Sequence, residues 1–307
     1  MKKIVLYLAA FSILGNTHAN NLPIADVHFH PHPSIHPSSA LEKINENHVR
    51  WLASGEIKGG KNLRDKYKAF LKDRYLPLGG QSDFNKIFFK DGEDALEDIN
   101  NPLFKKTIRN LEEEFKKGEI VGVGELFINK KSRDRLARTS NVFAPTYQKV
   151  LDLVDKYDGV MQVHVDSDKR AVEQLKMLAN YNPSGKIIWA HCGGDTTANE
   201  VRMILTSHPN IFCDLSFRHP PMVSQRISAK KPNKKIFDNH SLDNSWKSLI
   251  EELPNRFMIG TDTKKLGPYN SAIYAIRNGL LANLSVDTAK KVAIENAERI
   301  FNKNQSY

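Results

Sequence analysis

Residues 160–207 read VMQVHVDSDKRAVEQLKMLANYNPSGKIIWAHCGGDTTANEVRMILTS and contain one pattern twice. In each half a short apolar run is followed by a turn, and then by a stretch whose apolar residues are three and four positions apart. The short runs predict strands at 160–165 and 186–191, and the spaced residues predict amphipathic helices at 169–181 and 197–207. Strands that alternate with helices in this way form parallel units joined by right-handed crossovers.

The same alternation continues on both sides of this stretch. Further strands are expected at 23–28, 120–126, 210–216 and 256–260. Further helices are expected at 146–156, 245–253, 270–281 and 286–301. The pattern therefore predicts an α/β protein, and specifically a single (β/α)8 TIM-type barrel domain over residues 20–307.

Two parts of the chain do not follow the pattern clearly. In residues 31–119 no second and third strands can be recognised, and 86–90 is a poor candidate strand. Helices are expected there at 40–53, 63–74 and 102–117. We expect a barrel that is distorted in strands two and three, or an active-site insertion at this point. The polar segment 217–244, rich in Lys and Pro, follows the seventh expected strand and should lie over the catalytic face.

The chain begins with the pattern of a secretory signal. Lys2 and Lys3 precede an apolar run at 4–14, and Thr17-His18-Ala19 offers small residues at a cleavage position. The run is too short to span a bilayer comfortably, so we expect cleavage after Ala19 and no membrane span in the mature chain. Residues 1–19 are thus predicted to be a signal peptide, and the protein to be exported to a bacterial periplasm or secreted.

Composition excludes several classes of protein. With 307 residues, 40% hydrophobic and 26% charged, the chain is neither collagen-like, disordered nor a multi-span membrane protein. Its net charge of +10 falls to +8 without Lys2 and Lys3, which suits solubility and leaves nucleic acid as a less favoured partner. Cys192 and Cys213 lie near consecutive expected strands, but we expect no disulfide between them. The sequence does not specify an oligomeric state.

Residues that can bind metal occur at the ends of the expected strands. In Asp26-Val27-His28-Phe29-His30 the two histidines project to the same side of a strand, about 7 Å apart, and can chelate one ion. Such a pair alone is more often structural. Four further candidates each end an apolar strand: Glu125 in VGVGELF, His164 in MQVHVD, His191 in IIWAHCGG and Asp262 in MIGTDT.

Each of these six residues has an ordinary structural explanation, as a helix cap, a loop carboxylate or a hydrogen-bonded core histidine. That explanation is poor for all six together. Polar residues that end the strands of a barrel converge at one face. Four imidazoles and two carboxylates buried together would be poorly satisfied without a cation, whereas a divalent metal satisfies them at once.

The ordered set of motifs resembles the amidohydrolase superfamily of metal-dependent hydrolases, in particular its amidohydrolase-related branch and TatD-like relatives. The resemblance runs from the HxH pair to the closing segment 294–301, IENAERIF, and departs from the family in strands two and three. It implies that His28, His30 and Asp262 hold one ion. His164 and His191 would hold a second, with Glu125 as the bridge. Imidazole and carboxylate ligands suit zinc best, with manganese, cobalt or iron as alternatives. Some relatives use one ion instead of two.

The resemblance also implies a reaction. A bound metal lowers the pKa of its water to roughly 7 and polarises the group under attack. Asp262 would accept the proton of that water and pass it to the leaving group. With one ion only, a histidine such as His191 would position the water instead of binding metal. The expected activity is hydrolysis of an ester, lactone or amide in a small organic molecule.

Three other functions remain open at this stage. TatD-like relatives suggest a phosphodiesterase or nuclease, although no aromatic and basic stripe that would follow a nucleic-acid strand is visible. The amidohydrolase-related branch also suggests a metal-dependent decarboxylase. A metal-binding protein without catalysis is the least favoured reading, because six ligand types would then serve only the metal.

Residues around the expected site are candidates for substrate contact. His32 follows the first strand in a proline-rich loop, and Arg218 and His219 follow the seventh. A guanidinium at the mouth could hold a carboxylate or phosphate through two hydrogen bonds. Asp26 points to the same side as the HxH pair but one layer deeper, which suits orientation of the ligands better than ligation.

Overall fold

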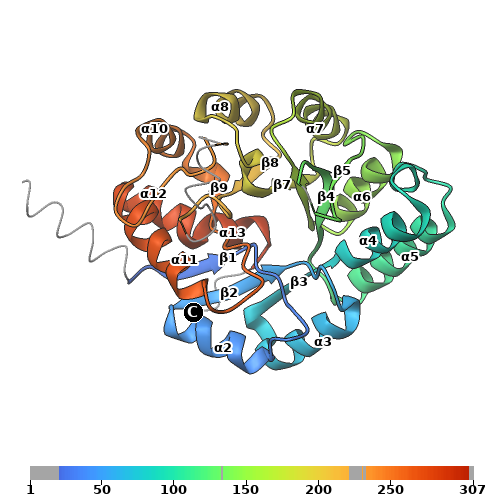
Figure 1. The fold of residues 1–307 in the computed structure, drawn as a ribbon, viewed down its shortest axis with the longest axis horizontal. Coiled ribbons are helices and arrows are strands. Elements are labelled where there is room, and N and C mark those ends of the chain that lie inside the picture. Colours follow the sequence, from blue (N-terminus) through green and yellow to red (C-terminus); the bar gives the residue numbers. More distant parts are fainter. Residues whose placement is uncertain (1–20, 133, 221–229, 231–232, 304–307) are drawn as a thin grey trace, which may run out of the picture.

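Eight parallel strands form a closed ring with helices on its outside (Figure 1). The computed structural model describes residues 21–132, 134–220, 230 and 233–303. The strands are neighbours in the order β1-β2-β3-β4-β6-β7-β8-β9, and the short β5 pairs antiparallel with β4. The predicted (β/α)8 barrel is confirmed. The signal peptide expected at residues 1–19 lies outside the described residues.

The elements have the following bounds. The strands are β1 Ile24–Asp26, β2 Val49–Ser54, β3 Tyr75–Gly80, β4 Gly122–Lys130, β5 Arg138–Thr139, β6 Val160–Val165, β7 Lys186–Trp189, β8 Ile211–Asp214 and β9 Phe257–Met258. The first helices are α2 Pro37–Glu46, α3 Gly60–Leu71, α4 Gln81–Asp91, α5 Pro102–Lys116, α6 Pro145–Lys156, α7 Lys169–Tyr181 and α8 Ala198–Ser207. The later ones are α10 Asn244–Glu252, α11 Tyr269–Ala275, α12 Val286–Lys290 and α13 Asn296–Ile300.

Hydrogen bonds beyond the short strands β1 and β9 close the ring. Val27 N donates to the Ile259 carbonyl at 2.9 Å, and His30 N donates to the Thr263 carbonyl at 3.1 Å. Between them, Asp262 N donates to the His28 carbonyl at 2.6 Å. The backbones that follow β1 and β9 are therefore held side by side at the carboxyl end of the barrel.

Apolar residues form two cores, one inside the barrel and one around it. The inner core includes Trp51, Leu78 and Val160. Phe301 also packs in this core, with its ring centre 5.6 Å from the ring centre of Trp51. The outer core lies between the strands and the helices and is the larger of the two. No helix among the described residues is both long and apolar enough to cross a membrane.

Strands two and three pair in register with each other and with β4, so the distortion expected in them is wrong. The expected active-site insertion within residues 31–119 stays a prediction; two helices, α4 and α5, lie between β3 and β4. The helix expected at 40–53 ends at Glu46, and its last part is strand β2. The helix expected at 63–74 ends at Leu71, before strand β3. The candidate strand 86–90 lies inside helix α4.

Backbone turns explain these errors. His48 and Lys72 follow the two helices with φ angles of 52° and 53°. Positive φ is uncommon for residues other than glycine, although asparagine, aspartate and histidine adopt it more often than the rest. Short apolar runs next to a helix cannot be told from a continuation of it by periodicity. In β3, Pro77 and two glycines further weaken the pattern of a strand.

Capping residues fix the start of the helices that follow the central strands. The Asp168 carboxylate accepts a hydrogen bond from Ala171 N at 3.0 Å and caps α7. Thr197 and Glu200 form a capping box at the start of α8. These caps satisfy backbone donors at the helix ends and set the turn between each strand and its helix. Those turns surround the end of the barrel where the polar side chains gather.

Candidate metal centre

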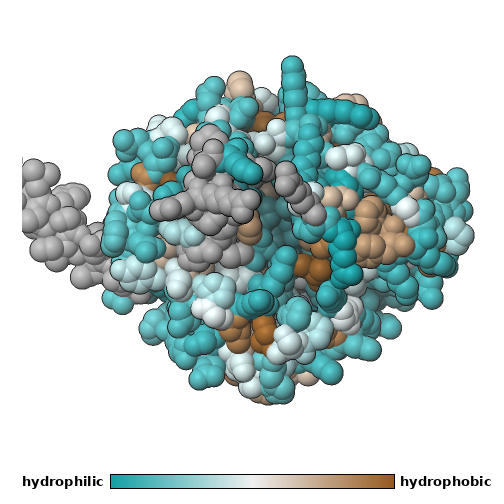
Figure 2. All heavy atoms as spheres, in the orientation of Figure 1, coloured by the Kyte–Doolittle hydropathy of each residue, from teal (hydrophilic) through white to brown (hydrophobic). Residues whose placement is uncertain are grey.

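The six predicted ligands converge at the carboxyl end of the barrel. His28 and His30 follow β1, Glu125 and His164 lie within β4 and β6, His191 follows β7 and Asp262 follows β9. All are buried except His164, which is partly exposed. The face of the molecule in Figure 2 is largely hydrophilic and is hollowed near its centre. The six side chains named from the sequence therefore lie together at this end of the barrel.

One oxygen of Glu125 faces the residues that follow β1. Glu125 Oε2 is 3.3 Å from His28 Nε2 and 3.4 Å from His30 Nε2. Asp262 Oδ1 is 3.0 Å from His30 Nε2 and 3.8 Å from His28 Nε2. Four potential ligands thus surround one small space.

The other oxygen of Glu125 faces the remaining two histidines. Glu125 Oε1 is 2.8 Å from His164 Nδ1 and 3.3 Å from His191 Nε2. The single carboxylate therefore lies between two sets of imidazoles, one set for each of its oxygens. Groups of three ligand atoms close enough to share an ion include His28 with His30 and Glu125, and Glu125 with His164 and His191.

The separations fit metal coordination. Ligands placed tetrahedrally at zinc's usual distance of about 2.0–2.1 Å lie about 3.3 Å from one another. The separations from Glu125 Oε2 to the two imidazoles that follow β1, 3.3 and 3.4 Å, are of that size. The Nε2 atoms of His28 and His30 also lie 3.2 Å apart. The first set has four candidate ligands, whereas the second has three, so an ion held by the second set would have room for water or substrate.

Electrostatics in the metal-free centre couple the carboxylate to the imidazoles. Burial opposes ionisation of Glu125, yet the charge of His28 and hydrogen bonds from His164 and His191 hold the pKa of Glu125 well below its usual range. Burial lowers the pKa of His164, but hydrogen bonds to Asp166 and Glu125 outweigh it and raise that pKa to about 9. The centre is therefore strongly polar, and the Glu125 carboxylate is stabilised by the imidazoles around it.

A second set of groups orients each imidazole through its other ring nitrogen. His28 Nδ1 lies 3.1 Å from Asp214 Oδ2, and His30 Nδ1 lies 3.1 Å from the Gly55 carbonyl. His164 Nε2 lies 3.2 Å from Asp166 Oδ1, and His191 Nδ1 lies 2.7 Å from Ser216 Oγ. Such partners fix the ring and the nitrogen offered to a metal.

These orienting groups were not predicted from the sequence. Asp214 and Ser216 lie inside the strand expected at 210–216, in alternate positions that face the barrel mouth. Two polar side chains on the same side of an apolar strand were the pattern that could have indicated them. Asp26, expected to orient the ligands, instead accepts hydrogen bonds from Thr261 Oγ1 at 2.7 Å and Thr261 N at 3.0 Å. It thus holds the backbone next to Asp262 and does not touch an imidazole ring among the described contacts.

The expected substrate contacts have other partners in the structure. Arg218 is fully buried and does not lie at the mouth. Its side chain donates hydrogen bonds to the carbonyls of His191 and Cys192 at 2.7 and 2.9 Å. The guanidinium also lies 4.5 Å from the Trp246 ring centre. These contacts make it a support of the turn that carries His191. Its contact with substrate stays a prediction that the structure does not favour.

His219 and His32 differ in their surroundings. His219 is buried, its Nε2 lies 3.3 Å from the Thr261 carbonyl, and burial lowers its pKa to about 4. His32 lies on an exposed loop, where its Nδ1 is 2.6 Å from Ser34 Oγ. Cys192 and Cys213 are buried and form no disulfide, as expected.

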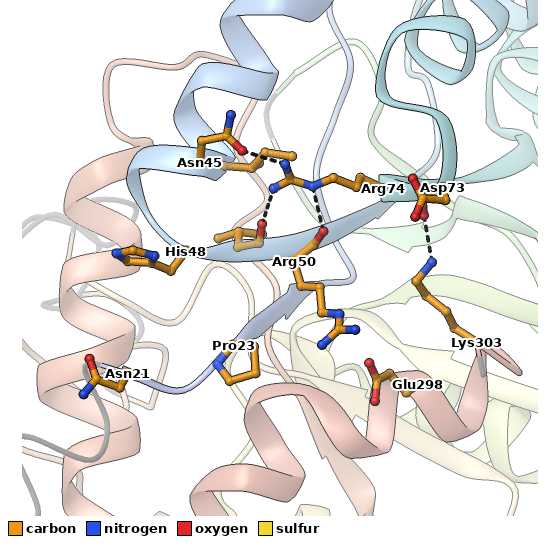
Figure 3. Close-up of a pocket in the computed structure, with 11 residues that line it drawn as sticks. Asn21, Pro23, Asn45, His48, Arg50, Asp73, Arg74, Glu298 and Lys303 are labelled. Carbon is orange, nitrogen blue, oxygen red and sulfur yellow. Dashed lines mark hydrogen bonds between the residues drawn. The ribbon is translucent and has the colours of Figure 1, made fainter. Parts of the chain in front are cut away.

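A pocket of about 600 Å³ lies at the opposite end of the barrel (Figure 3). Its lining comes from the starts of β1, β2 and β3 and from the end of the chain. Arg74 donates to the carbonyls of Arg50 and Val49 at 2.9 and 2.7 Å, and Lys303 donates to the Asp73 carbonyl at 2.7 Å. Two cationic side chains of this pocket, those of Arg74 and Lys303, are therefore hydrogen-bonded to backbone carbonyls. Barrel enzymes place their sites at the other end.

Comparison with known proteins identifies the fold. No family profile matches the chain, and no curated protein is significantly similar to it. A probable 2-pyrone-4,6-dicarboxylic acid hydrolase from Acinetobacter baumannii has a TM-score of 0.55 at 13% identity, over 92% of this chain and 100% of that one. A 4-oxalomesaconate hydratase from Rhodopseudomonas palustris has a TM-score of 0.57 at 11% identity, over 91% and 95%. A dihydropyrimidinase from Brevibacillus agri has a TM-score of 0.54 at 11% identity, over 91% and 71%.

These neighbours show that the chain shares their barrel fold. Membership of the amidohydrolase superfamily, which the sequence resemblance implied, stays a prediction. The similarity to TatD-like relatives stays a prediction. The structural neighbours include a hydrolase and a hydratase. An inactive dihydroorotase-like domain from Chaetomium thermophilum also shares the fold, with a TM-score of 0.51 at 10% identity, over 92% of this chain and 80% of that one. The fold therefore leaves the reaction open, and the argument for function depends on the site.

Proposed function

We propose that this protein is a metal-dependent hydrolase that cleaves an ester, lactone or amide bond in a small organic substrate. The observation that carries the proposal is the Glu125 carboxylate, buried between two sets of imidazoles at separations of 2.8–3.4 Å. His28, His30, Glu125 and Asp262 would hold one divalent ion. Glu125, His164 and His191 would hold a second, with zinc as the first choice and manganese, cobalt or iron as alternatives.

The bound metal would supply an activated water at neutral pH and polarise the bond under attack. Asp262 is placed to accept a proton there. Burial opposes its ionisation, but the hydrogen bond to His30 and the charges of His28 and His30 hold its pKa well below the usual range, so it is a carboxylate near neutral pH. We assign it the transfer of the proton to the leaving group.

The His191 ring could either bind a metal ion or position a water molecule. Burial lowers its pKa, so the ring is neutral near pH 7, as both ligation and hydrogen bonding to water require. Ser216 Oγ fixes Nδ1 at 2.7 Å and leaves Nε2 facing Glu125. With two ions His191 would be a ligand, and with one ion it would position the water.

The test is to purify the protein without added metal or chelator, measure its metal content, and assay esters, lactones, amides and phosphodiesters before and after metal removal. We expect one or two ions per chain and turnover that a chelator abolishes and zinc or manganese restores. Failure to bind any divalent metal would contradict the proposal. Bound metal without turnover would favour a non-catalytic metal-binding protein.

The same assay separates the alternatives. Release of carbon dioxide from an aromatic acid, without incorporation of water, would favour a decarboxylase. Salt-sensitive DNA binding with phosphodiester cleavage would favour a nuclease. We further propose that the protein acts after export and with a small molecule as its partner, a proposal that depends on the sequence of residues 1–19.

A further inference from the structure

A buried charged cluster joins Glu56, just after strand β2, to helices α3 and α5, and none of its members is a proposed metal ligand. Arg64 on α3 donates from Nη1 to Glu56 Oε1 at 3.0 Å and from Nη2 to Glu114 Oε2, on α5, at 2.6 Å. Glu56 is fully buried, and only 2% of Arg64 is exposed. We call these three residues the Arg64 cluster.

Stability alone does not explain the Arg64 cluster. Taking charges out of water costs about as much as their attraction returns, and apolar replacements of buried ion networks are often neutral or stabilising. The pairing here is also incomplete, because Glu56 Oε2 and Arg64 Nε have no hydrogen-bond partner among the described residues. Burial raises the pKa of Glu56 to about 7 although Arg64 lowers it. The cluster therefore stabilises the fold less than apolar side chains in the same space would.

The residue before Glu56 touches two supports of the metal centre. The Gly55 carbonyl lies 3.1 Å from His30 Nδ1 and fixes that ring. Gly55 also lies against the peptide that carries the bridging carboxylate: a Cβ at position 55 would be 1.8 Å from the Gly124 oxygen and 2.6 Å from Glu125 N. A shift of Gly55 would thus move one ligand directly and press on the backbone of another.

We propose that the Arg64 cluster is a positioning device for the metal centre. The cluster binds the Glu56 side chain to helices α3 and α5 and so fixes the position of Gly55. In that position the Gly55 carbonyl orients the His30 ring so that Nε2 faces the site, and the Gly55 backbone packs against Gly124 and Glu125. The inference depends on the proposed metal-dependent function. None of the three residues contacts a ligand directly, so they act through Gly55.

The test compares metal binding in the wild type and in Glu56→Gln, which keeps the shape of the side chain and removes its charge. Zinc affinity is measured by competition with a chelator, and the visible spectrum of the cobalt(II)-loaded protein reports ligand geometry. We expect zinc to bind about 10–100-fold more weakly, the range found for groups that orient ligands, and the cobalt bands to shift. A general loss of stability would not move the spectrum.

Glu119→Gln is the matched control. It removes an exposed ion pair, Lys61 Nζ to Glu119 Oε2 at 2.7 Å, that also ties α3 to the chain around the end of α5. We expect wild-type affinity and spectrum from it. If Glu56→Gln does not fold, Arg64→Lys, which keeps the charge but cannot make both contacts, is measured in the same way.

Each outcome decides the inference. A folded Glu56→Gln or Arg64→Lys with wild-type affinity and cobalt spectrum would overturn it while leaving the proposed function intact. Equal weakening in Glu119→Gln would overturn it too, because the effect would then be general. A wild type that binds neither zinc nor cobalt would refute the proposed function, and the positioning role with it.

Discussion

Both ends of the barrel carry charged side chains, but the two ends satisfy these side chains differently. At the amino end, Arg74 and Lys303 donate to main-chain carbonyls (Figure 3). At the carboxyl end, four imidazoles and two carboxylates have mainly one another as neighbours. Charged groups bound to the backbone stabilise the fold, whereas clustered ligand groups need a cation to be satisfied. The difference indicates which end carries chemistry.

The strongest test of this comparison is to remove the proton acceptor from the carboxyl end. Asp262→Asn keeps the shape of the side chain but cannot take up a proton near neutral pH. Loss of general-base action typically costs about 10²–10⁴-fold, so we expect kcat to fall by that factor. Turnover is measured on the substrate that the panel identifies.

Metal content and melting temperature are the controls for Asp262→Asn. Because Asp262 is also a proposed ligand, activity is compared at saturating metal. Wild-type turnover in a folded, metal-loaded Asp262→Asn would contradict the role assigned to this carboxylate.

The next largest effect is expected from a residue that orients a ligand. Asp214 Oδ2 lies 3.1 Å from His28 Nδ1, and Gln162 Nε2 donates to the same oxygen at 3.1 Å. Asp214→Asn should weaken metal binding by about 10–100-fold, because the ring loses its carboxylate partner. Chelator competition measures this, and unchanged affinity would show that His28 needs no such support.

A smaller and graded effect is expected from pH. In the metal-free protein the pKa of His164 is about 9, above the ordinary value near 6.5, so this ring is protonated at pH 7 and must lose its proton to bind metal. The affinity of the ion held by His164 should therefore rise with pH, by up to tenfold per unit, and level off above about pH 9.

Calorimetry in buffers of different ionisation enthalpy measures the proton released on binding, and the wild type should release more than His164→Ala. Equal proton release from the two proteins, or an affinity that does not change between pH 6.5 and 8.5, would contradict the assignment of His164 as a ligand.

Much of this arrangement could be predicted from the sequence, for a local reason. Strand β6 begins and ends where its short apolar run does, and His164 near its end was recognisable as a candidate ligand. Strands β2 and β3 were missed, because His48 and Lys72 end the helices before them at positive φ, and periodicity cannot tell a short apolar run beside a helix from a continuation of that helix.

Contacts across the barrel could not be predicted in the same way. Gly55 was missed because its role depends on His30 and Glu125, which come from other strands. Arg218 was placed at the mouth by its position after a strand, but its guanidinium folds back under the turn that carries His191. Spacing along the chain shows which strand end a residue occupies, and packing decides where its side chain goes.

The smallest effect on activity is expected at the amino end, where Arg74→Met removes a charged group bound to the backbone. Arg74 donates to the carbonyls of Arg50 and Val49 and to Asn45 Oδ1, the last at 2.6 Å. Its loss leaves these acceptors with fewer partners, so the free energy of unfolding should fall by about 1–3 kcal/mol, measured by urea denaturation.

Metal content and kcat should stay at their wild-type values in Arg74→Met, because the residue lies at the end of the barrel opposite the ligands. The matched control is Arg135→Met, an exposed arginine near the ring of Phe89, for which a change within about 0.5 kcal/mol is expected. Loss of activity in Arg74→Met at unchanged stability would contradict the comparison, since a functional group would then lie at the amino end. Loss of stability alone would show that the cations there hold the starts of the strands together, while the chemistry belongs to the groups around Glu125.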